Sequence, residues 1–337
     1  MKIAIFLDSR STGGIETHVA QLSRGLLAFN IPFDLIFYNR YDDQHPLLRQ
    51  LKGSVNVINM KGSIFNLSQY LRKERPLLHT HGYKAGIIGR LLCSLHRLPV
   101  VSTHHNGDPG KGRVFIYNLI DRLTSCVSQN ICVSERIMNK VPGAKTLIPN
   151  FVDFPKGEEN HNGRYQVAFV GRFSSEKGPD IFAKIADGLP YSFAMYGDGE
   201  MRLPLKESNP KIRMYGSVDM KNHWQKIRLL VIPSRYEGLP LVAIEALSHG
   251  IPVVSSRAGD LPKLIKAVGI GNTVNLENID VFKKRINFWM QKNSEKYLTD
   301  ATKARTFIYN NYSLRACIPS VIEVYRNAAN CYAEEIC

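Results

Sequence analysis

The sequence predicts an α/β protein built from two successive doubly wound, Rossmann-like domains. Its 337 residues are many for a single hydrophobic core. Short apolar runs rich in β-branched residues alternate with helical patterns along the whole chain. A polar stretch with Pro and Gly at residues 155–165 interrupts this alternation, which then restarts. Each half therefore carries its own strand–helix series, the pattern of a parallel sheet covered by helices.

We expect residues 1–155 to form the first domain. Its clearest helical pattern is IETHVAQLSRGLLAF, and its strands are expected in KIAIFLD, FDLIFYN, VNVINM, LLHTHG, PVVSTHH, NICVS and KTLIPNFV. Residues 156–312 are expected to form the second domain, with strands in QVAFVGRF, YSFAMYG, IRMYG, LLVIPS, IPVVSS and NTVNL. Residues 313–337 read as a long C-terminal helix.

Composition narrows the class of protein. The six cysteines are scattered without a C-x-x-C pair, which favours reduced thiols in the cytosol. No apolar run is long enough to cross a bilayer, and the first apolar run is too short for a signal peptide. The net charge of +15 predicts an anionic partner. Because no nucleic-acid motif is present, nucleic acid is not expected.

The positive charge is concentrated in residues 61–113. This segment carries nine Lys and Arg against two acidic residues, a net charge of +7, and leucines and isoleucines interleave with them in YKAGIIGRLLCSLHRL. Such a segment fits an anionic membrane surface. The alternative is a core-packed helix with a solvated basic edge. The basic residues are Lys61, Arg72, Lys73, Arg75, Lys84, Arg90, Arg97, Lys111 and Arg113.

Two glutamates stand out in PSRYEGLPLVAIEALSHGIPVV. Glu237 follows the predicted strand LLVIP, and Glu245 lies about two turns into a predicted helix that is apolar nearly all round. A buried carboxylate needs hydrogen-bond donors. Ligand hydroxyls could supply them, because ligands bind at the carboxyl ends of parallel strands. Backbone N–H groups or a buried Arg could equally do so.

Three further loops follow predicted strands. In FVGRFSSEKG, Arg172 and Lys177 stand beside a helix start and suit a diphosphate. In STGGIETH, Gly13 and Gly14 would let a ligand approach the backbone, or form only a tight turn. The same two alternatives hold for Gly197 in MYGDGEMR.

Four histidines follow two further strands. His79 and His81 end one predicted strand, and His104 and His105 end another, so all four are expected to face one cleft. Their spacing suits hydrogen bonding to a polar ligand better than zinc. No Asp-x-Asp pair occurs in the chain, so we expect neither a metal nor a cofactor.

Taken together, GRFSSEKG, Glu237 and Glu245 with seven residues between them, GGIETH and LIPNFVD resemble the retaining glycosyltransferases of family 4. The resemblance covers nearly the whole chain. It implies a GT-B fold, with a nucleotide-diphosphate sugar held mainly by the second domain and the C-terminal helix returning to the first. It also implies roles for single residues: Arg172 and Lys177 on the diphosphate, Glu245 on ribose, and Glu237 and His105 near the transferred sugar. The implied donor-binding positions also include Gly13, Gly14, Gly197 and Leu241.

The resemblance implies a metal-independent hexosyltransferase or N-acetylhexosaminyltransferase that uses a nucleotide sugar, expected to be a UDP-sugar. The expected acceptor is a lipid-linked or envelope saccharide, with the protein on the inner face of the cytoplasmic membrane. Two alternatives stay open: a nucleotide-sugar epimerase of the same fold, and a non-catalytic sugar- or lipid-binding subunit. One departure concerns the sugar end of the donor site, because Lys263 in AGDLPK stands where the family often has Glu.

Overall fold

The protein is described by a computed structural model that covers residues 2–9, 13–40, 45–51, 53, 55–105, 112–155, 157 and 163–334. The chain divides into two compact units. Unit 1 comprises Met1–Asp153 and Leu314–Cys337, and unit 2 comprises Phe154–Ser313. The stretch 155–165, which the sequence predicts as a linker, lies largely outside the described residues.

Unit 1 contains a parallel sheet of seven strands in the order β3-β2-β1-β4-β5-β6-β7. The order reverses at β1, as in doubly wound folds, so ligands are expected beyond the carboxyl ends of the neighbouring strands. The strands are β1 (Ile3–Ser9), β2 (Phe33–Arg40), β3 (Asn56–Asn59), β4 (Leu77–His81), β5 (Val100–His104), β6 (Gln129–Cys132) and β7 (Lys145–Leu147).

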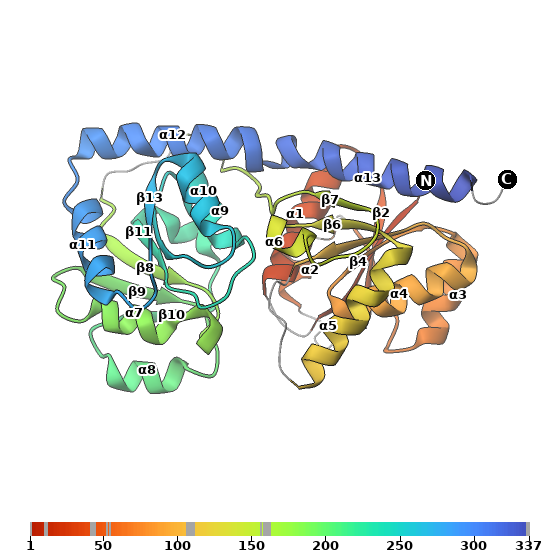
Figure 1. Ribbon diagram of the computed structural model, residues 1–337, viewed down its shortest axis with the longest axis horizontal. Coiled ribbons are helices and arrows are strands. Elements are labelled where there is room, and N and C mark those ends of the chain that lie inside the picture. The colour runs from red at the N-terminus through yellow and green to blue at the C-terminus, as the bar shows by residue number, and fades with distance from the viewer. Residues whose placement is uncertain are drawn as a thin grey trace. The chain divides into compact units, whose positions relative to one another are not determined.

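Helices cover both faces of this sheet, because successive strand residues point to opposite sides. One face of β1, including Ile5 and Leu7, packs on α1 (Gly14–Ala28) and α13 (Leu314–Glu334). The other face, including Phe6, packs on α3 (Ile64–Glu74) and α4 (Tyr83–His96). Figure 1 shows these two helical layers. The remaining helices are α2 (Pro46–Leu51), α5 (Arg113–Thr124), α6 (Glu135–Met138) and the 3₁₀ turn η1 (Ser125–Val127).

Unit 2 repeats the plan with a parallel sheet of six strands in the order β10-β9-β8-β11-β12-β13. Its strands are β8 (Gln166–Val170), β9 (Ser192–Tyr196), β10 (Arg213–Gly216), β11 (Ile227–Ile232), β12 (Val253–Ser256) and β13 (Gly271–Val274). Helix α7 (Pro179–Ala186) packs against α11 (Ile279–Met290), and α9 (Leu241–Ser248) packs against α12 (Ser294–Tyr312). The others are α8 (Arg202–Ser208), α10 (Leu261–Val268), η2 (Ser175–Lys177), η3 (Met220–Asn222) and η4 (Trp224–Lys226).

The predicted fold class is confirmed, because both units are doubly wound parallel sheets. Each of the thirteen predicted apolar runs overlaps one of these strands. Among the described residues, no helix combines the length and the apolar character that crossing a bilayer requires.

One expectation about the basic segment 61–113 is wrong. Arg90 is completely buried, with no exposed side-chain surface, and forms an ion pair with Asp121. Its guanidinium also donates to the Ser102 hydroxyl at 3.0 Å and to the Thr124 hydroxyl at 2.8 Å. A buried guanidinium needs this many acceptors. Arg90 therefore joins α4, β5 and α5 inside unit 1 and cannot belong to a basic surface.

Candidate functional site

A buried ion pair joins two loops at the carboxyl edge of the unit 2 sheet. The Lys177 ammonium, at the end of η2 after β8, donates to both oxygens of Glu237, at 2.9 and 2.8 Å. Ser234, just after β11, donates its hydroxyl to Glu237 Oε1 at 2.8 Å. Only 6% of the Glu237 side chain is exposed, against 30% for Lys177. The carboxylate is therefore desolvated, paired and fixed, while part of the Lys177 side chain remains exposed.

A second ion pair joins the loop after β11 to the first turn of α7, which follows the Lys177 loop. Both terminal nitrogens of Arg235 donate to the Asp180 carboxylate, at 2.9 and 2.7 Å, and this keeps the pKa of Asp180 below its usual range. The backbone N–H of Arg235 donates to the Glu176 carbonyl at 2.7 Å. Bidentate geometry fixes orientation as well as charge. Arg235 and Asp180 were not among the predicted site residues, although Arg235 lies two residues before Glu237 and Asp180 lies three residues after Lys177, in the first turn of α7.

The two predicted diphosphate ligands, Arg172 and Lys177, differ in exposure. The Arg172 side chain is 58% exposed, and its contact with Glu176 is long, at 3.9 Å. Lys177 is half-buried because Glu237 attracts it into the loop junction. The two cations thus differ: the Arg172 side chain is mostly exposed to solvent, and the Lys177 ammonium is held in place by Glu237.

Glycine is required where these loops meet backbone to backbone. Gly178 has φ 70°, and a Cβ there would lie 2.1 Å from the Pro233 carbonyl oxygen. At Gly197 a Cβ would lie 1.9 Å from the Gly171 carbonyl oxygen. The two alternatives for Gly197 were a ligand against the backbone or a plain turn. The close approach of the loop that contains Gly171 explains why position 197 is a glycine.

Helix α9 begins at Leu241, which is buried, directly after the Glu237 loop. Glu245 was expected about two turns into a buried helix. It is the fifth residue of α9, just over one turn in, and is half-buried. The helix is therefore less enclosed at this position than its apolar sequence predicts. Lys263, where the sequence departs from the family pattern, is exposed on α10.

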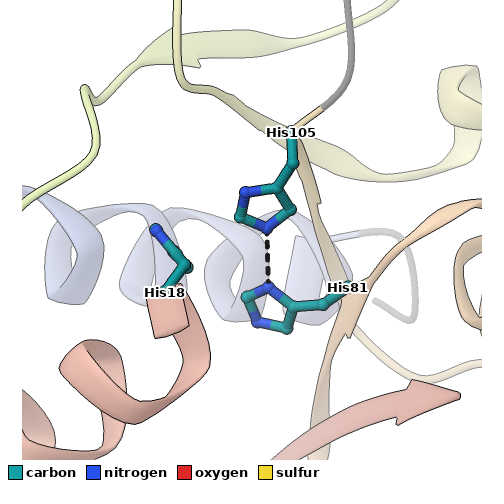
Figure 2. A group of neighbouring side chains, drawn as sticks. All are labelled: His18, His81 and His105. Atoms are coloured by element: carbon teal, nitrogen blue, oxygen red, sulfur yellow. Dashed lines mark hydrogen bonds between the residues drawn. The ribbon is translucent and has the colours of Figure 1, made fainter. Parts of the chain in front are cut away.

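In unit 1 the corresponding edge carries histidines. His18 lies in α1, His81 ends β4, and His105 follows β5; Figure 2 shows their rings turned toward one another. His81 Nδ1 and His105 Nε2 share a hydrogen bond of 3.1 Å. His18 Nδ1 faces the Asn150 amide oxygen at 3.0 Å, so its other nitrogen is turned away from that partner. His18 was missed by the sequence analysis, although it ends the quoted motif GGIETH.

These imidazoles are neutral at physiological pH. Burial lowers the pKa of His18 to about 4, although its hydrogen bond with Asn150 opposes the shift. Burial, followed by the neighbouring imidazoles, lowers the pKa of His81 and of His105 well below the usual value. His81 Nε2 is buried without a hydrogen-bond partner. The edge of unit 1 therefore offers uncharged donors and acceptors, which suit hydroxyl groups.

The expectation that His79, His81, His104 and His105 all face one site is wrong. His79 points the same way as His81 but is enclosed, bonded to the Tyr325 hydroxyl and the Thr103 hydroxyl, each at 2.7 Å. His104 points to the opposite face of the sheet, where it contacts Asn130 at 2.9 Å and Asp121 at 3.4 Å. Adjacent strand residues alternate in direction, so His104 and His105 cannot both reach the cluster.

The ligating nitrogens of His18, His81 and His105 lie within 4.8 Å of one another, so these three could hold a metal ion. Gly13 precedes α1 in extended backbone, and a Cβ at Gly14 would meet nothing within 4 Å. The residues just before Gly13 lie outside the described part of the chain. Among the residues that the structure describes, space therefore exists beside the first turn of α1, which agrees with either alternative for Gly13 and Gly14, a ligand against the backbone or a tight turn.

Comparisons with known sequences agree across both units. Residues 152–311 match the family Glycosyl transferases group 1, and residues 12–154 match Glycosyltransferase Family 4. The chain is 26% identical to an uncharacterized glycosyltransferase of Methanocaldococcus jannaschii, over 94% of this chain and 95% of that protein. It is 27% identical to an Escherichia coli UDP-Gal:alpha-D-GlcNAc-diphosphoundecaprenol alpha-1,3-galactosyltransferase, over 81% of each chain.

Solved structures share the fold. Anabaena HepE, crystallised with UDP, superposes with a TM-score of 0.78 at 16% identity, covering 97% of this chain and 100% of HepE. Sucrose-phosphate synthase from Thermosynechococcus elongatus gives a TM-score of 0.81 at 17% identity, covering 97% of this chain and 98% of that one. At such low identity these likenesses concern the arrangement of strands and helices.

Proposed function

Because this chain belongs to glycosyltransferase family 4 and has the GT-B fold, we propose that it transfers a hexose or N-acetylhexosamine from a UDP-sugar to a lipid-linked or cell-envelope saccharide. The observation that carries the proposal is the Lys177–Glu237–Ser234 arrangement at the carboxyl edge of the unit 2 sheet. The galactosyltransferase relative supports a UDP-sugar donor and a lipid-diphosphate acceptor, as its name states. HepE, with UDP bound, supports the same nucleotide.

In this proposal the two cations of unit 2 act on the diphosphate. An ammonium has three N–H donors, and the two contacts with Glu237 occupy two of them. Lys177 can therefore turn one donor toward a phosphate while Glu237 still holds it in place. Arg172, which is exposed, folds onto the second phosphate from solvent. Both stabilise the negative charge that develops on the leaving diphosphate, which is the task a metal performs in other transferases.

Glu237 positions the transferred sugar and does not attack it. Its Oε1 accepts hydrogen bonds from both Lys177 and Ser234, and Oε2 accepts one from Lys177. A carboxylate so engaged is a weak nucleophile, which supports same-face attack by the acceptor with retention at the anomeric carbon. We assign Glu245, in the first turns of α9, to the ribose hydroxyls, and Gly13, Gly14 and Leu241 to the space around the donor.

His105 contributes an uncharged hydrogen bond to the sugar in this proposal. Its nitrogen toward His81 is occupied, so its other nitrogen is the one available to a ligand. A neutral imidazole at this place stabilises a sugar hydroxyl without adding a charge beside the developing cation. The proposed reaction uses neither a cofactor nor a metal, and it takes place at the inner face of the cytoplasmic membrane.

Acceptor-dependent release of nucleotide tests the proposal. A panel of UDP-, GDP- and ADP-sugars is first screened by thermal shift, because a ligand that binds only the folded state raises the melting temperature. The donor that binds is then incubated with a lipid-linked disaccharide, and free UDP and the anomeric configuration of the product are measured. We expect UDP release only with acceptor, and a retained anomer. Release of free sugar without acceptor would instead indicate an epimerase, and donor binding without any turnover a binding subunit.

A further inference from the structure

Helix α5 exposes an apolar stripe to solvent. Phe115, Leu119 and Leu123 follow one another at four-residue spacing, and Ile116 and Ile120 lie beside them. Their exposed fractions are 51%, 47%, 65%, 56% and 38% in that order. Residues four apart share one face of a helix, so these five side chains form a continuous strip. A surface helix normally turns such a stripe toward the core, and α5 turns it outward.

Helix α4 extends the stripe. The two helices pack side by side (Figure 1). The rings of Tyr83 on α4 and Tyr117 on α5 stack with their centroids 5.5 Å apart. Leu91 and Leu95, one turn apart on α4, are 57% and 73% exposed. We call this surface the α4–α5 face: Leu91, Leu95, Phe115, Ile116, Leu119, Ile120 and Leu123. A contiguous apolar surface of this kind marks an interaction site, whereas single exposed leucines do not.

Cations adjoin one end of the α4–α5 face. Arg97 ends α4, two residues after Leu95, and is exposed. The Arg75 guanidinium donates to the Arg97 carbonyl at 3.4 Å, which brings the end of α3 to the end of α4. Arg72 and Lys73 in the last turn of α3 are also exposed. Arg97 and Arg75 thus adjoin the Leu95 end of the apolar strip, and Arg72 and Lys73 lie in the same last turn of α3 as Glu74, which pairs with Lys2.

We propose that the α4–α5 face inserts shallowly into an anionic lipid bilayer, with Arg72, Lys73, Arg75 and Arg97 against the lipid headgroups. An apolar stripe bordered by cations is the pattern of a helix lying in the membrane interface. Each basic residue near such a surface adds to binding and loses its effect at high salt. The inference deepens the proposed function and rests on it, since a lipid-linked acceptor would lie in the same bilayer.

This proposal relocates the membrane contact that the sequence predicts. The sequence analysis assigned it to residues 61–113 because of their charge, and counted Arg90 among the contacting residues. Arg90 is buried, and most of the apolar contact lies beyond that segment, on α5. The charge pattern located the cations at the end of α3 and α4 but not the helix that they border.

Co-sedimentation with vesicles tests the proposal. The full-length protein is mixed at low salt with vesicles of phosphatidylglycerol and phosphatidylethanolamine, and separately with phosphatidylcholine alone. We expect binding to the anionic vesicles and release at high salt, because the Debye length falls from about 10 Å at 0.1 M salt to about 3 Å at 1 M. Leu119→Glu with Leu123→Glu should lower binding about tenfold or more, since burial of both leucines is lost. Their side chains are exposed, so the fold should persist.

A matched control comes from unit 2. Leu203 and Phe288 are also exposed apolar side chains, at 72% and 52%, so Leu203→Glu with Phe288→Glu should bind vesicles like the wild type. The two native tryptophans, Trp224 and Trp289, are buried, so Leu123→Trp adds a reporter whose fluorescence should shift to the blue on vesicles. Thermal shift with UDP should be unchanged in every variant of the α4–α5 face.

Three results would overturn the proposal: wild-type protein that stays in the supernatant with anionic vesicles at low salt, equal loss of binding in the unit 2 control, or an unshifted Leu123→Trp spectrum. A wild-type dimer that Leu119→Glu with Leu123→Glu dissociates, without vesicle binding, would assign the face to a second copy of this chain and overturn it too. Vesicle binding without sugar transfer would support the membrane face while contradicting the proposed function.

Discussion

The two units present opposite chemistry at the same edge of similar sheets. In unit 2 the loops after β8 and β11 carry paired charges, Lys177 with Glu237 and Arg235 with Asp180. In unit 1 the ends of β4 and β5, with α1 beside them, carry imidazoles that burial keeps neutral. The strand order favours ligand binding at these edges in both units, and the side chains decide which ligand suits each. Charge suits a diphosphate, and neutral imidazoles suit sugar hydroxyls.

The two edges also hold their polar side chains in place in different ways. Unit 2 fixes its charged groups with bidentate ion pairs between two loops, which holds the charges in place before a ligand arrives. Unit 1 fixes its imidazoles by enclosing them and bonding one nitrogen of each, as His18 does with Asn150. Substitutions should therefore lower turnover most in unit 2, because no neighbouring group replaces a lost charge there.

The largest effect is expected at the cations of unit 2. Arg172→Ala and Lys177→Ala should each lower turnover by about 10²–10³, the usual cost of removing one donor from a preorganised site. Steady-state kinetics with UDP-sugar and acceptor measure it. Lys206→Ala, an exposed lysine of α8, is the control and should retain full turnover. Near-normal rates in both cation variants would show that the donor does not bind at this edge.

Substitution of Lys177 and substitution of Arg172 should affect the melting temperature differently. Lys177→Ala leaves the Glu237 carboxylate buried with Ser234 as its one side-chain donor within the described part of the chain. The melting temperature of this variant should therefore fall, whereas that of Arg172→Ala should not. Adding Glu237→Gln to Lys177→Ala removes the uncompensated charge and should restore part of the stability but none of the activity. Equal melting temperatures in both single variants would contradict the ion pair.

A smaller effect is expected in unit 1. His105→Gln should lower turnover about tenfold, as expected for losing one hydrogen bond to the sugar. His96→Gln is the control, since His96 lies in α4 and bonds Ser68. Because His105 is neutral throughout the physiological range, the wild-type rate should show no titration assignable to it near neutral pH. A rate that requires a protonated group removed by His105→Gln would contradict the neutral assignment.

The enclosed histidines should also make stability depend on pH. The pKa of His18 is lowered from 6.5 to about 4 in the folded protein, so the unfolded chain binds the extra proton between these values. This contribution is complete above about pH 6.5 and is lost as the pH falls toward 4. His18 alone should cost about 2 kcal/mol at about pH 5, measured by urea unfolding. His18→Gln should flatten the dependence; an unchanged slope would refute it.

The smallest expected effect is that of a chelator. In the proposed reaction Arg172 and Lys177 supply the positive charge that the leaving diphosphate needs, so excess EDTA should leave turnover unchanged. Although His18, His81 and His105 could hold an ion, the proposed reaction does not use one. Activity lost on chelation and restored by Mg²⁺ or Mn²⁺ would contradict this and would mean that the reaction needs a metal ion.

The sequence predicted the strands well because parallel strands are short apolar runs between turn residues, a local signal. Contacts between distant residues were beyond it. Nothing local distinguishes Arg90, buried beside Asp121, from the exposed Arg97 seven residues later. The pairing of Lys177 with Glu237 joins loops sixty residues apart. His104 was the exception, because strand alternation alone separates it from His105.

The late position of helix α13 in the chain has a consequence for folding during synthesis. It completes the core beneath β1 and α1, and Tyr325 closes over His79, yet the whole of unit 2 is made before it. At ordinary synthesis rates the first sheet waits roughly 8–30 s for residues 154–313 to be made. Throughout that interval its α13-facing surface is open, and chaperones have an apolar target. A ribosome that stalls within unit 2 would therefore leave a chain in which neither unit is complete, because unit 1 still lacks α13.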